Sequence, residues 1–94
     1  MPQQALFALN SPFMLEQAKA LAARADVLAA PSSSERVAIL YRTTLGRRPS
    51  SREAELAVSF ITEAQSRAGE RSGLTPWEQY AQVLLLTNEM MFLD

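Results

Sequence analysis

The sequence predicts an all-α fold, a compact array or bundle of four helices preceded by a short N-terminal helical turn. Apolar residues recur at three-and-four spacing in four separate segments, which is the pattern of helices with one buried face. Helix-start and helix-stop residues stand between these segments. No segment alternates apolar and polar residues over the length of a strand. The 94 residues are expected to form one helical domain spanning residues 1–94.

The N-terminal part combines a short apolar segment with a long helix. Residues 2–9 are expected to form a helical turn. Asn10 and Ser11 are both N-cap candidates, and Pro12 suits the first turn of the helix that follows. The spacing predicts one continuous helix over residues 13–29. Its apolar stripe is expected to hold Met14, Ala18, Leu21, Ala22, Ala25 and Leu28.

The second helix is expected to follow the break at Pro31. Ser33 or Ser34 is the expected N-cap. The helix should end at Gly46, because a left-handed residue at the end of a helix costs glycine little.

The third helix starts close behind that stop. Pro49 cannot donate a hydrogen bond into a continuing helix, and Ser50 with Glu53 has the spacing of a capping box. The helix is expected to run from about Ser51 to Arg67. The corner between the second and third helices should therefore hold two helices side by side.

The fourth helix begins with a second capping box, Thr75 with Glu78, and extends to about Met90. Trp77 and Tyr80 share its apolar face, so they are expected to pack in the core. Stacking of a sugar or cofactor ring on these two side chains is the alternative.

Composition excludes several classes of site. The chain has nine Lys or Arg against ten Asp or Glu, so no excess of positive charge indicates nucleic acid. It has no Cys and no His, the usual ligands of zinc and haem and common catalytic groups. We therefore expect no metal site, no cofactor and no catalytic residue in this chain. No apolar run reaches the length of a membrane span, so no membrane insertion is expected.

Four arginines gather at the central corner and form the candidate anion or partner contact: Arg42, Arg47, Arg48 and Arg52. Guanidinium groups beside a helix N-terminus can hold sulfate, phosphate or a carboxylate. The alternative is structural. Arg47 and Arg48 would then complement the dipole of the second helix, and Arg52 would pair with a nearby Glu.

A DNA-binding helix–turn–helix is a further alternative for this corner. The recognition helix would then carry Glu53, Glu55 and Glu63 against Arg52 and Arg67, and these acids would repel phosphate.

Three patches, taken together and in order, resemble the C-terminal end of a planctomycete-type family of large proteins of unknown function. They are Pro2–Phe13, Leu40–Arg42 with Leu45–Pro49, and Leu84–Leu85 with Asn88–Glu89 and Asp94. Met90 follows Glu89 where that family usually reads Asn-Glu-Phe, and Thr87 stands where Ser is common. A looser likeness links the Leu-Gly-Arg-x-Pro turn to extracellular helical modules.

The resemblance implies that the chain is a C-terminal fragment of a larger protein that is exported, periplasmic or on the cell surface. Such proteins often carry cytochrome-c-like domains. The implied function is a non-catalytic helical module that packs against the rest of the parent protein or binds a partner. The alternative is an accessory subdomain of an enzyme whose active site lies mostly upstream.

The apolar residues ahead of the first long helix would lose their cover in such a fragment. Exposed apolar patches promote self-association, so we expect a two-fold homodimer. The residues expected at its interface are Leu6, Phe7, Leu9 and Phe13.

Overall fold

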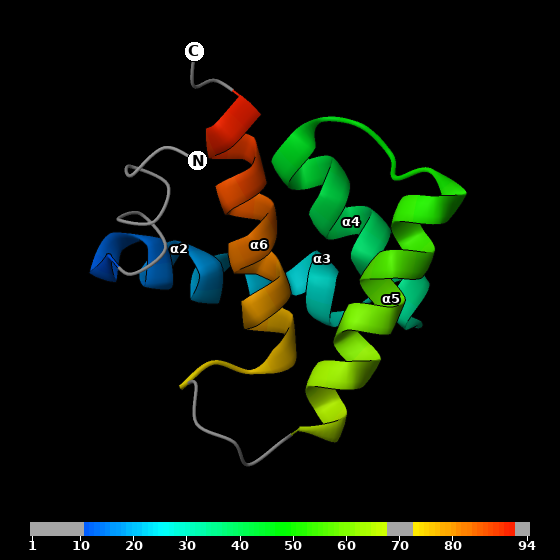
Figure 1. The fold of residues 1–94 in the computed structure, drawn as a ribbon, viewed down its shortest axis with the longest axis horizontal. Coiled ribbons are helices and arrows are strands. Elements are labelled where there is room, and N and C mark those ends of the chain that lie inside the picture. Colours follow the sequence, from blue (N-terminus) through cyan, green and yellow to red (C-terminus); the bar gives the residue numbers. More distant parts are fainter. Residues whose placement is uncertain (1–10, 68–72, 92–94) are drawn as a thin grey trace.

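The structure, a computed structural model, describes residues 11–67 and 73–91, and all regular structure in these ranges is helical (Figure 1). The predicted all-α fold is confirmed. The turn expected over residues 2–9 lies outside the described residues. The helices are α2 (Pro12–Ala22), α3 (Ala25–Leu28), α4 (Ser33–Leu45), α5 (Ser51–Ser66) and α6 (Pro76–Met91).

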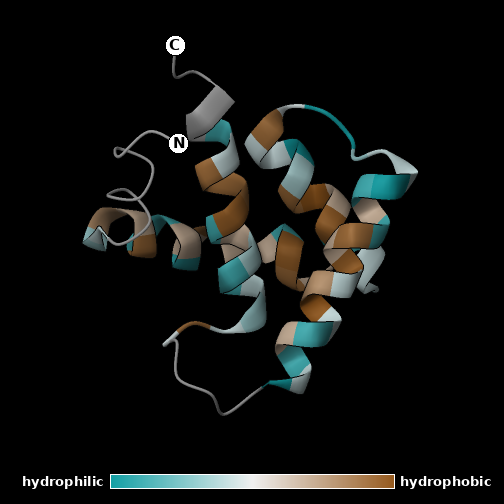
Figure 2. Cartoon of the chain, viewed as in Figure 1, coloured by the Kyte–Doolittle hydropathy of each residue, from teal (hydrophilic) through white to brown (hydrophobic). Residues whose placement is uncertain are grey.

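Helix α6 is the centre of the arrangement. It packs against α2 on one side and against α4 and α5 on the other (Figure 1). Helix α4 in turn packs against α3 and α5. Every helix of more than one turn therefore has a neighbour for its apolar face, which is the condition for a stable helical array. Figure 2 shows the apolar positions gathered where α4, α5 and α6 face one another.

The larger part of the core lies among α3, α4, α5 and α6. Leu40, Ile61, Val27 and Val37 are its largest fully buried side chains. The complete cluster of buried residues is Val27, Val37, Leu40, Tyr41, Ala57, Ile61, Tyr80 and Leu84. The predicted core role of Tyr80 is confirmed, because only 5% of the residue is exposed.

A second, smaller core lies where α2 meets α6. Its buried residues are all alanines: Ala18 and Ala22 on α2, and Ala81 on α6. Alanine has no side chain beyond Cβ, so two backbones can approach closely at such an interface.

The first long helix is not continuous, which corrects the prediction of one helix over residues 13–29. Helix α2 ends at Ala22, Arg24 is extended at φ −59° and ψ 143°, and α3 starts at Ala25. A continued helix would place Val27 about 140° around the axis from Ala22. The break instead lets Val27 enter the larger core with no exposed surface, while Leu28 is 59% exposed.

The N-cap of α4 is Ser32 and not Ser33 or Ser34, which both lie inside the helix. Ser32 is extended, and its Oγ accepts a hydrogen bond from the Glu35 N–H at 3.2 Å. Glu35 lies three residues after Ser32, and this Ser-x-x-Glu spacing distinguishes Ser32 from the two serines that follow.

The remaining helix boundaries follow the sequence closely. Ser11 caps α2, with its Oγ accepting from the Met14 N–H at 3.0 Å. Gly46 has the predicted positive φ, 79°. The Thr75 N–H donates to Glu78 Oε1 at 2.9 Å, and the Glu78 N–H donates to Thr75 Oγ1 at 3.2 Å, so the second capping box is confirmed.

Candidate functional site

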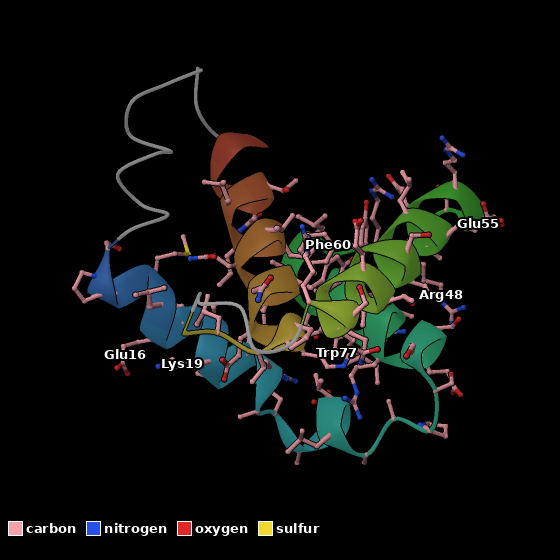
Figure 3. The ribbon with its side chains drawn as sticks, turned by 60° about the horizontal axis from the view of Figure 1, so that its bottom comes forward. Glu16, Lys19, Arg48, Glu55, Phe60 and Trp77 are labelled. Atoms are coloured by element: carbon pink, nitrogen blue, oxygen red, sulfur yellow. The ribbon has the colours of Figure 1, made fainter. Side chains whose placement is uncertain are left out.

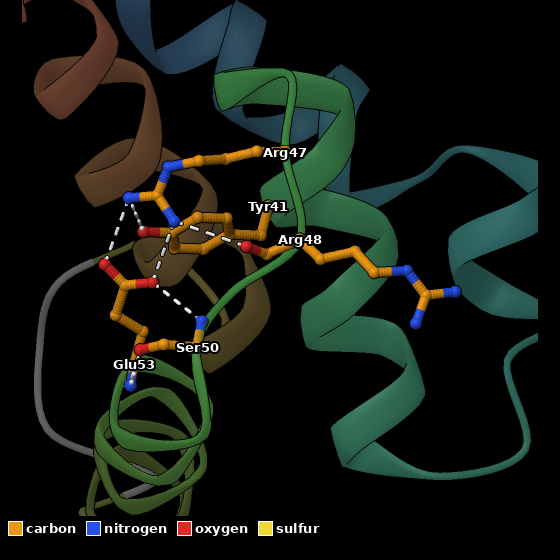
Figure 4. A network of polar contacts seen from close by, with 5 residues as sticks. All are labelled: Tyr41, Arg47, Arg48, Ser50 and Glu53. Carbon is orange, nitrogen blue, oxygen red and sulfur yellow. Dashed lines mark hydrogen bonds and ion pairs between the residues drawn. The ribbon is translucent and has the colours of Figure 1, made fainter.

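The corner between α4 and α5 is closed by a polar network around Arg47 (Figure 4). Its two terminal nitrogens donate to Glu53 Oε1 at 3.0 Å and to Oε2 at 3.1 Å. The guanidinium also donates to the Tyr41 hydroxyl at 3.1 Å and lies over the Tyr41 ring. The Ser50 N–H donates to Glu53 Oε1 at 2.8 Å, and the Glu53 N–H donates to Ser50 Oγ at 3.1 Å. The network joins the end of α4 to the start of α5.

The network shifts the pKa values of three of its members, and the hydrogen bond to the Glu53 carboxylate raises the pKa of Arg47. The hydrogen bond from Arg47, together with the Ser50 N–H, holds the pKa of Glu53 well below its usual 4.5. Burial, followed by the nearby Glu53 carboxylate, raises the pKa of Tyr41 above its usual 10.0. At neutral pH the Tyr41 hydroxyl is therefore neutral and the Arg47–Glu53 ion pair is fully charged. These four residues hold one another in place.

The structure divides the four arginines of the candidate anion site. Arg47 uses its donors on Glu53, Tyr41 and the Arg48 carbonyl. Arg48 points away from this network (Figure 4). Arg42 and Arg48 line one hollow together, and Arg52 lies exposed in the first turn of α5, outside that lining. Among residues 11–67 and 73–91, none of Arg42, Arg48 and Arg52 has an acidic partner within 4 Å.

The hollow that Arg42 and Arg48 line, here named the arginine hollow, has a volume of about 470 Å³. It lies against one side of α4, between the α2–α3 break and the corner. Arg24 lines it too, paired with Asp26 at 3.1 Å. The full lining is Arg24, Asp26, Glu35, Ala38, Ile39, Arg42, Thr43 and Arg48.

A second hollow, here named the apolar hollow, adjoins the first. Its volume is about 330 Å³, and it lies where α2, α4 and α6 meet. Arg24 and Thr43 line both hollows, so the two are neighbours. The full lining is Gln17, Ala20, Leu21, Arg24, Thr43, Thr44, Leu85 and Asn88.

Sequence reasoning identified Arg42 and Arg48 but missed Arg24. Arg24 lines both hollows because the chain leaves the helix at that residue. No Gly, Pro or Asn marks this break, so no local signal could have placed Arg24 beside Arg42. The apolar hollow is built from three helices, and its lining follows only from their packing.

The aromatic residues of α6 serve the core. Tyr80 packs against Phe60 with ring centroids 6.0 Å apart and against Trp77 at 6.4 Å. The Arg36 guanidinium lies 4.9 Å from the centroid of the half-buried Trp77 ring. In Figure 3, Phe60 and Trp77 lie between helices, whereas Glu16 and Lys19 project from α2. Trp77 therefore packs between α6 and the start of α4.

The candidate dimer residues are placed only in part. Leu6, Phe7 and Leu9 lie outside the described residues. Phe13 lies in the first turn of α2 and is 72% exposed.

Membrane-spanning helices and metal clusters are two further features of interest in the part of the chain that the structure describes. No helix there is long and apolar enough to cross a membrane. No group of three or more His, Cys, Asp or Glu side chains there could hold a metal ion.

Comparison with known proteins finds a match to a protein family. No curated protein and no solved structure matches the chain. The sequence pattern of the family PSD1, protein of unknown function (DUF1553), matches residues 1–61, which include α2, α3, α4, the corner and most of α5. Two of the three patches that carry the family resemblance lie inside this match. Since the match spans more than half of the sequence, the chain belongs to the PSD1 family of proteins of unknown function (DUF1553).

Proposed function

We propose that this chain is a non-catalytic packing or interaction module of a larger exported protein. In this proposal residues 1–94 are a single helical domain, the C-terminal part of that protein, and its other domains hold any haem. The resemblance to planctomycete-type proteins with cytochrome-c-like domains supports this origin. The partner is the remainder of the parent protein or a second protein.

The observation that carries the proposal is the pair of adjoining hollows. An apolar hollow of about 330 Å³ stands next to one lined by three arginines, and the two share Arg24 and Thr43. Interfaces between proteins typically combine an apolar centre with a polar rim in which arginine is enriched. The corner network supports the same role, because Glu53 and Tyr41 are held by structural contacts.

The second candidate is an accessory subdomain of an enzyme whose active site lies mostly upstream. Arg42 and Arg48 favour it, because both are exposed and could contact an anionic substrate held by another domain. The two candidates differ in one respect. Replacing both arginines by glutamine would abolish turnover by the parent protein if the chain is an enzyme subdomain, but not if it is a non-catalytic module.

The interaction role is tested by photocross-linking in the larger protein, in its own cell. Ala20, which lines the apolar hollow, is replaced by photoreactive benzoyl-phenylalanine, and exposed Thr62 on α5 is the matched control. We expect cross-links from position 20 to one defined polypeptide segment, in the same chain or a partner. Equal, scattered cross-links from positions 20 and 62 would contradict the proposal.

We also propose that the isolated chain forms a homodimer through the segment ending at Phe13. The 72% exposure of this aromatic side chain supports the proposal. Phe13→Asp should give a monomer in sedimentation equilibrium with unchanged helical circular dichroism, because the exposed side chain contributes little to folding. A monomeric unmodified chain at high concentration would contradict it.

A further inference from the structure

We propose that the arginine hollow and the apolar hollow together bind an extended polypeptide segment in which a carboxylate and an aliphatic side chain, two residues apart, point to the same face. The inference rests on the proposed interaction role and names the chemistry of the partner. The carboxylate would bind between Arg42 and Arg48. The aliphatic side chain would enter the apolar hollow beside Leu21 and Leu85.

The preference for a carboxylate follows from the charges around the arginine hollow. Three arginines face two acids there, and both acids already have local contacts. Asp26 accepts two hydrogen bonds from Arg24, at 3.1 and 3.2 Å. Glu35 lies in the first turn of α4, where its carboxylate accepts a hydrogen bond from the Ser32 hydroxyl. The guanidinium groups of Arg42 and Arg48 keep their planar donor forks for an added carboxylate.

The preference for an aliphatic neighbour follows from the second hollow. Leu21 and Leu85 are both half-buried, and with Ala20 they give this hollow an apolar wall. Covering such a wall with an aliphatic side chain removes apolar surface from water. Gln17 and Asn88 lie at the same hollow, and their side-chain amides can donate to and accept from a peptide backbone.

The shared lining favours one polypeptide over a small anion. Arg24 and Thr43 belong to both hollows, so the two subsites are contiguous. A sulfate or phosphate would occupy the cationic side alone and leave the apolar side in water. Alternate residues of an extended chain point to the same face and stand about 6.6 Å apart along the backbone, so side chains two residues apart can reach adjoining hollows. Affinity should be modest, with dissociation constants on the order of 0.1–1 mM, because the ion pairs are exposed.

The experiment titrates the isotope-labelled chain with a capped tetrapeptide, acetyl-Leu-Gly-Asp-Gly-amide, and follows backbone amides by NMR. We expect saturable shifts at Arg24, Thr43 and Leu85. The shifts should weaken several-fold when ionic strength rises from about 0.02 M to about 0.3 M, because exposed charges are screened. Two control peptides carry Asn for Asp or Gly for Leu, and each should bind at least about fivefold more weakly.

Matched variants separate the arginines. Arg42→Gln and Arg48→Gln should each weaken binding of the tetrapeptide at least about fivefold, whereas exposed Arg67→Gln at the end of α5 should leave it unchanged. Neither arginine has a described acidic partner, so both variants should fold normally, with unchanged circular dichroism.

Four outcomes would overturn the inference. Absent shifts would show that the surface does not bind the peptide. Equal binding of the Asp and Asn peptides would show that it does not recognise a carboxylate. Sodium sulfate that produces the same shifts at the same concentration, including at Leu85, would reduce the surface to an anion site. Sedimentation that shows a dimer broken by Arg42→Gln would assign the surface to a second copy of the chain. Failure of the peptide alongside a defined cross-link from position 20 would refute this chemistry and leave the interaction role standing.

Discussion

The two places where the chain leaves a helix, the α4–α5 corner and the α2–α3 break, are built in opposite ways. At the corner, Gly46 takes a positive φ of 79°, Pro49 follows, and the Ser50–Glu53 capping box opens the next helix. At the break, Ala22, Ala23 and Ala25 are good helix formers, and Arg24 is extended with no side-chain cap. Local chemistry therefore specifies the corner.

The break is decided by burial. A straight helix could present its stripe to α6 through Ala18 and Ala22, and would then carry Val27 away from α4. Ending the helix gives Val27 a place in the larger core with no exposed surface. Burying a valine side chain contributes about 1.5–3 kcal/mol, which outweighs the helix propensity of a few alanines. The break also brings Arg24 to the arginine hollow, whereas the corner brings Arg48.

The largest effect is expected where the break depends on the core. Val27→Ala removes two methyl groups from a fully buried site, so it should lower the free energy of unfolding by about 2 kcal/mol. Denaturation in urea measures the loss. Leu28→Ala, at the exposed neighbouring residue of α3, is the matched control and should change little. Equal losses in both variants would mean that burial of Val27 does not decide the break.

Substitution of Gly46 at the corner should lower the stability of the folded chain. A Cβ at Gly46 would meet no atom within 4 Å, so Gly46→Val is penalised by the backbone alone, by about 1–2 kcal/mol. Thermal unfolding measures the loss. Gly46→Asn should lose less, because asparagine tolerates the left-handed region. An unchanged melting temperature for the valine variant would show that the corner does not need this residue.

The corner network should make the stability of the folded chain depend on pH. The pKa of Glu53 is lowered in the folded chain, so its contribution is complete above its usual 4.5 and is lost as pH falls below that value. Glu53→Gln should lower the melting temperature at about pH 7, and its difference from the unmodified chain should shrink towards about pH 3. Exposed Glu55→Gln is the control. A difference that stays constant with pH would show that the ion pair contributes nothing.

The smallest effect is expected at the ion pair of the break. The Arg24 and Asp26 side chains are 48% and 49% exposed, and exposed ion pairs contribute little. Asp26→Asn should leave the melting temperature unchanged within error. A loss as large as that of Gly46→Val would mean that the ion pair, rather than Val27, holds the break.

The same contrast separates what could be predicted in the candidate site from what could not. Arg42 and Arg48 flank the corner, where neighbouring residues specify both the end of α4 and the start of α5. The proximity of these two arginines could therefore be expected. Arg47 lies between them but turns to Glu53 and Tyr41, because Glu53 lies one helical turn into α5 and Tyr41 faces it from α4. No spacing rule distinguishes these directions. Arg24 joined the site only through the unexpected break.

The sequence by itself determined the helical class, the stop at Gly46, the two capping boxes and the apolar faces of α4 and α6, because these depend on residues within one helical turn of each other. Its match to the PSD1 family over residues 1–61 is likewise a property of the sequence. Only the tertiary structure decided the end of α2, the burial of Val27 and the two hollows. These depend on contacts between helices far apart in the chain, where the gain from burying apolar surface exceeds local conformational preference.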